Sequence, residues 1–145
     1  MERVNAIDVL NRLYVVHNRS LPMYLGYANA PALRGEEGAK ELLGSIVADQ
    51  QDFVERIGAL VLDSGNRVAA GEFPMAFTGY HDLSYEFLVG KMIEHQKHDL
   101  ATIQKCVEQL NPSPVAKALA EECLGAAKGH LDSLEELPPP ASSSE

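Results

Sequence analysis

Residues 39–63 read AKELLGSIVADQQDFVERIGALVLD, and this stretch decides the fold. Its large apolar side chains recur at intervals of three, four or seven positions, at Leu42, Ile46, Phe53, Ile57 and Leu60. This spacing places them on one face of an α-helix, whereas a half-buried strand needs apolar residues at every second position. Gly65 follows almost at once, and glycine is the usual residue just beyond a helix. The sequence therefore predicts an amphipathic helix that ends near Asp63.

The same helical spacing of apolar residues occurs in three other segments. The first segment spans about residues 4–28. Pro22 lies inside it and is expected to kink the helix or to end it near Ser20, because proline lacks the amide hydrogen that a helix interior uses. The third and fourth segments span about residues 81–110 and 115–137. With the segment at 39–63, the chain is predicted to form four amphipathic helices.

Four helices of similar length, each with one apolar face, can bury those faces only by packing together. The predicted fold is therefore all-α, a four-helix bundle. A chain of 145 residues has the size of one domain. We expect the bundle to occupy residues 1–137 and the proline- and serine-rich residues 138–145 to form a disordered tail.

Residues 65–79 connect the second and third predicted helices. Fully extended, this linker reaches about 50 Å, enough to run the length of the bundle. It therefore allows a long crossover between these helices as well as a simple up-and-down order. The linker also carries Phe73, Met75 and Phe77. We expect these side chains to cover an end of the core, and contact with a partner is the alternative.

Composition excludes several classes of partner. Asp and Glu outnumber Lys and Arg by 21 to 12, which gives a net charge of −9. Nucleic acids and anionic membrane surfaces both attract basic faces, so neither is an expected partner. No apolar run is long enough to span a membrane, and the first residues lack the pattern of a signal peptide. The two cysteines, Cys106 and Cys123, are expected to be reduced and buried, and the protein to be cytoplasmic.

Each predicted helix carries one polar residue on its apolar face, near the middle of the helix. These residues are His17, Gln50, Gln96 and His130. At a rise of about 1.5 Å per residue, they fall at similar heights and can form one polar layer. Buried polar groups must find hydrogen-bond partners, so we expect a closed network among imidazoles and amides. Tyr14, Asp49 and Asp99, on the flanks of the same faces, can complete it.

The bundle with this polar layer resembles the ferritin-like superfamily, and Ala48-Asp49-Gln50-Gln51-Asp52-Phe53 falls where the family's second helix carries acidic residues and His. In the di-iron members, two helices each give one Glu, and the other two each give Glu-x-x-His. The resemblance places His17 and Gln96 at the single Glu positions. It places Gln50-x-x-Phe53 and Ala127-x-x-His130 at the paired positions. Only His130 retains a ligand, so the resemblance implies a member that has lost its di-iron chemistry.

The favoured interpretation is thus a structural or interaction protein without cofactor or catalytic residues, acting as a homo-oligomer or with another protein. Its polar layer would set the register of the helices. The alternative is a metalloprotein that holds one transition-metal ion, such as iron or zinc, through imidazoles and carboxylates. The ligand set for that alternative is His17, Asp49, Asp52, His95 and His130. A ligand pocket between the helices is a third possibility.

Overall fold

The computed structural model describes residues 5–28 and 31–138, and within these residues it contains helices and no strand. The all-α prediction is therefore confirmed. The α-helices are α1 (Ala6–Asn18), α2 (Leu21–Ala28), α3 (Glu37–Asp63), α4 (Tyr85–Gln109) and α5 (Pro114–Glu135). Two 3-10 segments, η1 (Pro31–Leu33) and η2 (Met75–Asp82), precede α3 and α4. The tail predicted at 138–145 lies, apart from Pro138, outside the described residues.

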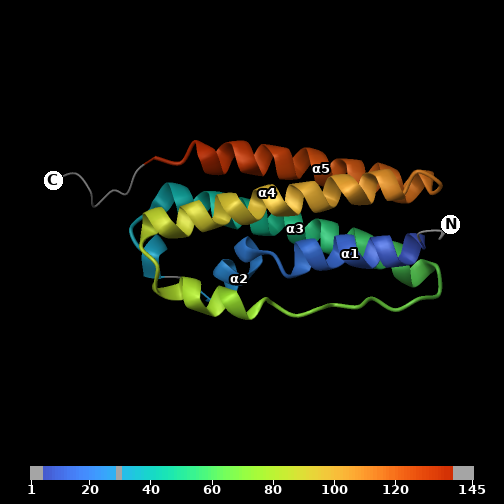
Figure 1. Cartoon of the computed structure of the whole chain (residues 1–145), viewed down its shortest axis with the longest axis horizontal. Coiled ribbons are helices and arrows are strands. Elements are labelled where there is room, and N and C mark those ends of the chain that lie inside the picture. Colours follow the sequence, from blue (N-terminus) through green and yellow to red (C-terminus); the bar gives the residue numbers. More distant parts are fainter. Residues whose placement is uncertain (1–4, 29–30, 139–145) are drawn as a thin grey trace.

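The helices lie side by side along the long axis of the molecule (Figure 1). α1 and α2 follow each other along one side, and α3 returns antiparallel to them. After α3 the chain runs back along the whole length of the molecule, so that α3 and α4 point the same way. α1 packs against α3 and α4, and α5 packs against the same two helices. The long connection is therefore a crossover, as the length of the linker allowed.

The break between α1 and α2 lies where Pro22 predicted it. Arg19 and Ser20 separate the two helices, and the Ser20 hydroxyl oxygen accepts a hydrogen bond from the amide of Met23 at 3.2 Å. This arrangement caps the first turn of α2, whose amides lack partners within the helix. The predicted start of the third helix near residue 81 is wrong, because residues 75–82 form η2 and α4 begins at Tyr85.

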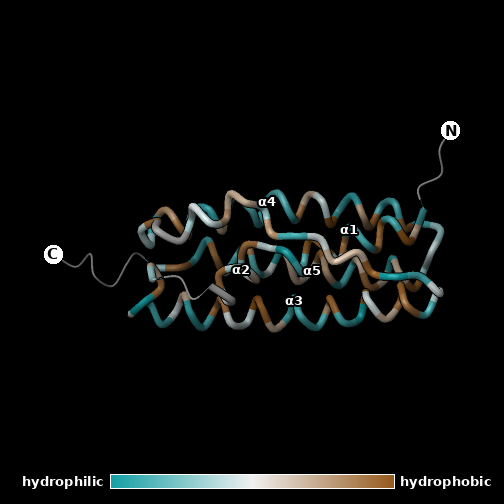
Figure 2. Tube along the Cα trace, turned by 90° about the horizontal axis from the view of Figure 1, so that it is seen from below, coloured by the Kyte–Doolittle hydropathy of each residue, from teal (hydrophilic) through white to brown (hydrophobic). Residues whose placement is uncertain are grey.

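Along α1, α3, α4 and α5, apolar and polar residues recur with the helical period (Figure 2), whereas α2 carries no charged residue. The buried apolar residues form two clusters. One surrounds Leu13, Ile57 and Ile103, and the other surrounds Leu21, Ile46 and Met92. On α1, α3 and α4, one buried polar side chain lies between members of the two clusters. These side chains are His17, Gln50 and Gln96.

The linker is attached to α1 along its path. The side-chain oxygen of Asn11 accepts a hydrogen bond from the Ala69 amide at 3.0 Å, and Arg19 Nε donates to the Gly71 carbonyl at 3.0 Å. Gly71 has φ +70°, and a Cβ there would lie 3.0 Å from Val15. Only glycine combines this backbone conformation with so close an approach.

An aromatic cluster holds the end of the linker and η2 against the helices. Phe77 is 3% exposed, and its ring packs against Tyr24, Tyr80 and His95. Phe73 and Phe77 therefore cover the core, in agreement with the predicted role. Met75 does not take part, because its side chain is 87% exposed.

Candidate functional site

The four polar residues predicted from the sequence surround one small cavity in the middle of the molecule. His17 comes from α1, Gln50 from α3, Gln96 from α4 and His130 from α5, and all four line the cavity. Its volume open to the centre of a water molecule is about 10 Å³. That is the space that a single water needs. The rest of the wall is mainly apolar and includes Phe53.

These four side chains do not hydrogen-bond to one another, so a network closed among them is not formed; of the flanking residues named with them, Asp49 does bond to His130. His17 Nδ1 donates to the Leu13 carbonyl at 2.8 Å, and Gln96 Nε2 donates to the Ala127 carbonyl at 3.0 Å. Gln50 Oε1 accepts from the Ser20 hydroxyl at 2.6 Å. His17 thus bonds within α1, whereas Gln50 and Gln96 bond to groups of other segments but not to one another. Because Nδ1 of His17 carries the hydrogen, Nε2 is the acceptor nitrogen.

His130 lies at the edge of the layer and pairs with a carboxylate. Its Nε2 is 2.8 Å from Asp49 Oδ2, which joins α5 to α3. The imidazole is 13% exposed and the carboxylate 56% exposed. This pair therefore links α5 to α3 at the edge of the polar layer. The imidazole of His130 is largely buried, and the carboxylate of Asp49 is exposed to solvent.

Asp99 of α4 also lines the cavity, and its acidity is strongly altered there. Burial raises its pKa to about 7. No hydrogen bond or ion pair of its carboxylate is found within residues 5–28 and 31–138. Burial also lowers the pKa of His17, and this effect is opposed by the Leu13 hydrogen bond and reinforced by the charge of His130. Both environments favour neutral side chains, so the cavity disfavours charge.

The raised pKa of Asp99 gives a testable dependence of stability on pH. The folded state holds the Asp99 proton up to about pH 7, whereas a free aspartate, with pKa 3.8, loses it much earlier. This residue's contribution to stability is therefore complete below pH 3.8 and is lost as the pH rises to 7. Asp99→Asn, which cannot ionise, should stabilise the protein by about 1 kcal/mol or more at pH 8 relative to its effect at pH 5. Urea unfolding at the two pH values measures this difference.

The exposed Asp132 on α5 provides the matched control for this experiment. Asp132→Asn makes the same substitution on an exposed helix surface, and the pH dependence of Asp99→Asn is read against it. An equal effect of Asp99→Asn at the two pH values would contradict a raised pKa for the half-buried Asp99.

The five residues of the alternative metal site are not brought together. His17 and His130 line the cavity, and Asp49 contacts His130. Asp52 instead pairs with Arg56 at 3.5 Å, one turn along α3. His95 belongs to the aromatic cluster, where its Nε2 is 3.2 Å from the Tyr80 hydroxyl. Across the described part of the chain, no three His, Cys, Asp or Glu side chains lie close enough together to hold a metal ion.

A di-iron centre does not fit the residues at its expected level either. The His17 and Phe53 rings meet edge to face with their centroids 5.5 Å apart, so an apolar ring occupies a position where a ligand would be needed. Gln50 and Gln96 are neutral amides that are already bonded within the chain. Two iron ions need several carboxylates to bridge them and to balance their charge.

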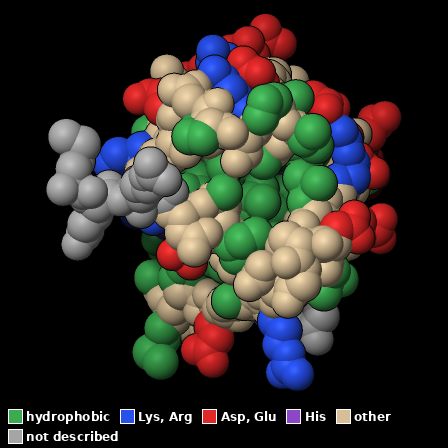
Figure 3. Space-filling view, turned by 90° about the vertical axis from the view of Figure 1, so that its right-hand side faces the viewer, with side chains coloured by type: hydrophobic (Ala, Val, Ile, Leu, Met, Phe, Trp, Pro, Cys, Tyr) green, Lys and Arg blue, Asp and Glu red, His purple; other side chains and the backbone are tan. Residues whose placement is uncertain are grey.

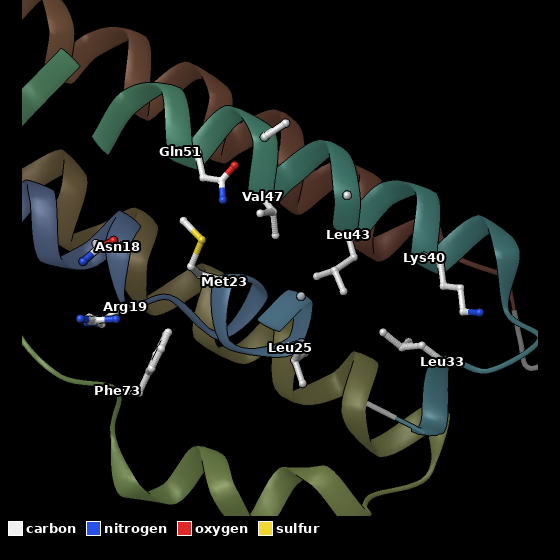
Figure 4. Close-up of a pocket in the computed structure, with 13 residues that line it drawn as sticks. Asn18, Arg19, Met23, Leu25, Leu33, Lys40, Leu43, Val47, Gln51 and Phe73 are labelled. Atoms are coloured by element: carbon white, nitrogen blue, oxygen red, sulfur yellow. The ribbon is translucent and has the colours of Figure 1, made fainter. Parts of the chain in front are cut away.

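A much larger hollow lies between α2, α3 and the linker. We call it the α2–α3 groove, and its volume is about 920 Å³ (Figure 4). Its walls include Arg19, Lys40 and Gly44. The side chains come from α1, α2, η1, α3 and the linker, so no single periodic pattern could have identified the groove.

Comparisons with protein-family models, with curated proteins and with solved structures gave no match. Among the described residues, no helix is both long enough and apolar enough to cross a membrane.

Proposed function

We propose that the protein is a non-catalytic helical bundle of ferritin-like architecture with a structural or protein-interaction role in the cytoplasm. In this proposal, the His/Gln layer at mid-height replaces the di-iron site. The observation that carries it is the hydrogen bonding of that layer. His17, Gln50 and Gln96 are each 6% exposed or less, and each is bonded to a group of this chain.

The connection of the helices supports the ferritin-like architecture. α1 and α2 together lie antiparallel to α3, and the crossover makes α3 parallel to α4 (Figure 1). One-crossover bundles of the ferritin-like class use this order. The break at Ser20 departs from a single long first helix.

The cavity supports a structural role for the layer in preference to catalysis. Its volume of about 10 Å³ admits one water, which leaves no room for a substrate. If the helices packed in another alignment, these buried polar side chains would lose their hydrogen-bond partners, and that alignment would be less stable. The layer would therefore select the one alignment of the helices in which Ser20 meets Gln50 and His130 meets Asp49.

An apolar surface at one end of the molecule supports a protein partner. Seen from the end that carries the start of α1 and the turn between α4 and α5, hydrophobic side chains gather in the middle of the surface (Figure 3). Leu62 near the end of α3 is 62% exposed, and Val115 near the start of α5 is 71% exposed. With a net charge of −9, a second copy of the chain or another protein is the expected partner in preference to nucleic acid or membrane.

The experiment combines a metal measurement with a mass measurement on protein purified without an affinity tag. We expect no stoichiometric iron or zinc, and no shift of Tm when either ion is added. Light scattering after size exclusion should give a mass above that of the 15.8 kDa chain. The double change Leu62→Asp and Val115→Asp should return it to one chain, because charges at an apolar contact lose hydration without a partner.

Phe87→Asp provides the matched control, because Phe87 is similarly exposed, at 69%, near the start of α4. This change should leave the mass of the assembly unaltered. Metal bound at one ion per chain and lost in His17→Leu would instead favour the metalloprotein alternative. A wild-type mass equal to one chain at high concentration would contradict self-association.

A further inference from the structure

The α2–α3 groove has the size of a small-molecule site. Its volume is about 920 Å³, and ligand pockets of proteins run from about 300 to 1,000 Å³. In Figure 4, α3 forms one wall, and α2 with the adjoining end of α1 forms the other. Met23, Leu43 and Val47 lie between these walls, and Leu33 lies toward the Lys40 end. The groove is separate from the polar layer and has no residue in common with its cavity.

The lining divides into an apolar surface and a few polar side chains. Its larger apolar members are Met23, Leu25, Leu33, Leu43, Val47 and Phe73. The polar members are Asn18, Arg19, Lys40 and Gln51. No Asp or Glu is among the described residues that line the groove, although the chain contains 21 of them. A cationic, apolar surface on so acidic a protein is complementary to an amphipathic anion.

Arg19 is held in place at one end of the groove. Its Nε donates to the Gly71 carbonyl at 3.0 Å, and its guanidinium lies 4.8 Å from the centre of the Phe73 ring. These two contacts use one donor and one face of the group. The terminal guanidinium nitrogens remain as donors in the planar arrangement that matches a carboxylate. Because the side chain is already ordered, little conformational entropy would be lost when an anion binds.

The amide side chains of Asn18 and Gln51 lie at the same end as Arg19, whereas Lys40 lies toward the other end (Figure 4). Asn18 Nδ2 makes only a long hydrogen bond of 3.4 Å, to the Ala70 carbonyl. Lys40 lies 3.9 Å from the exposed carboxylate of Glu37, so its charge is partly balanced. Arg19 is therefore the better anchor for an anionic group.

We propose that the α2–α3 groove binds a long-chain fatty acid. The carboxylate binds Arg19, with Asn18 and Gln51 as further hydrogen-bond donors. The hydrocarbon chain lies over Met23 and Val47 toward Leu33, where it removes apolar surface from water. This proposal goes beyond the structural role proposed above and does not depend on the polar layer.

Gly44 allows the groove to be filled without disturbing the core. It lines the groove on α3, and a Cβ added there meets no atom within 4 Å. Gly44→Phe should therefore fold, since it also replaces glycine within a helix by a better helix former. Gly125→Phe is the matched control, because Gly125 is exposed on α5 and its added Cβ also meets no atom within 4 Å.

The first measurement is calorimetric titration of palmitate into the full-length protein below its micelle concentration. We expect saturable binding of one palmitate per chain. Gly44→Phe should abolish binding, whereas Gly125→Phe should leave the affinity unchanged. Equal binding by the Gly44 variant, or no binding by the wild type, would overturn the proposal. Circular dichroism checks that the Gly44→Phe and Gly125→Phe variants fold as the wild type does.

The second measurement tests the charge recognition. Arg19→Gln should weaken palmitate binding roughly tenfold or more, because a charge-assisted hydrogen bond is lost, and Arg19→Lys should retain more of the affinity. The alcohol with the same chain length, which lacks the carboxylate, should bind the wild type roughly tenfold more weakly than palmitate. Equal affinity for alcohol and acid would overturn the assignment of a carboxylate site. A mass reduced to one chain by Gly44→Phe, together with no palmitate binding by the wild type, would show that a second copy occupies the groove instead and would overturn the proposal.

Discussion

Phe77→Ala is expected to lower the free energy of unfolding by about 3–5 kcal/mol, the usual cost of removing a buried phenylalanine. The ring is 3% exposed and packs against Tyr24, Tyr80 and His95. Its removal would leave a cavity between η2 and the helices, so the crossover would lose its main attachment at that end. Urea unfolding followed by circular dichroism measures the change.

Phe87 offers the same substitution at the surface. Its side chain is 69% exposed, so Phe87→Ala should change stability by no more than about 0.5 kcal/mol. Hydrogen exchange adds a second readout, because the amides of residues 75–82 should lose protection in the Phe77 variant before those of α3. A cost for Phe77→Ala near that of Phe87→Ala would contradict the role of this cluster in holding the crossover.

Ser20→Ala is expected to destabilise the protein by about 2–4 kcal/mol, because one hydroxyl serves two purposes. It caps α2 by accepting from the Met23 amide, and it donates to Gln50 Oε1 at 2.6 Å. Loss of the cap costs about 1 kcal/mol. Leaving the buried Gln50 oxygen without a partner adds about 1–3 kcal/mol. Chemical denaturation of the variant measures the sum.

A double-mutant cycle separates these two contributions. In a Gln50→Leu background there is no side-chain oxygen to satisfy, so Ser20→Ala should cost only the cap, about 1 kcal/mol. The exposed Ser45 on α3 supplies the control, and Ser45→Ala should have little effect. Equal costs of Ser20→Ala in both backgrounds would show that the Ser20–Gln50 hydrogen bond contributes nothing.

The position of the polar layer could be predicted because it depends on local periodicity. His17, Gln50 and Gln96 interrupt faces that are otherwise apolar, and the interruption is visible in the chain itself. Their hydrogen bonds could not be predicted in the same way. The partner of Gln50 is Ser20, which is distant in sequence, and the partner of Gln96 is the Ala127 carbonyl, on another helix. Which atom a side chain reaches depends on how the helices are placed, to within about an ångström.

The pKa of Asp99 could not be predicted from the sequence for the same reason. Its place on the flank of an apolar face followed from the spacing, but a pKa near 7 requires knowing that other helices remove water from the carboxyl group. His95 shows the opposite case. Its proximity to the apolar face suggested a ligand, whereas the crossover covers it with Phe77 and Tyr80. Only the folded chain brings that segment to α4.

The sequence by itself determined that this protein is helical, that its first helical segment breaks near Ser20, and that His17, Gln50 and Gln96 lie inside. These properties come from interactions between residues at most four positions apart along one helix, together with proline and glycine chemistry. The tertiary structure decided the path of the crossover, the separate bonding of the polar layer and the existence of the α2–α3 groove. Each of these depends on surfaces that come from segments far apart in the chain, and local spacing carries no record of how such surfaces meet.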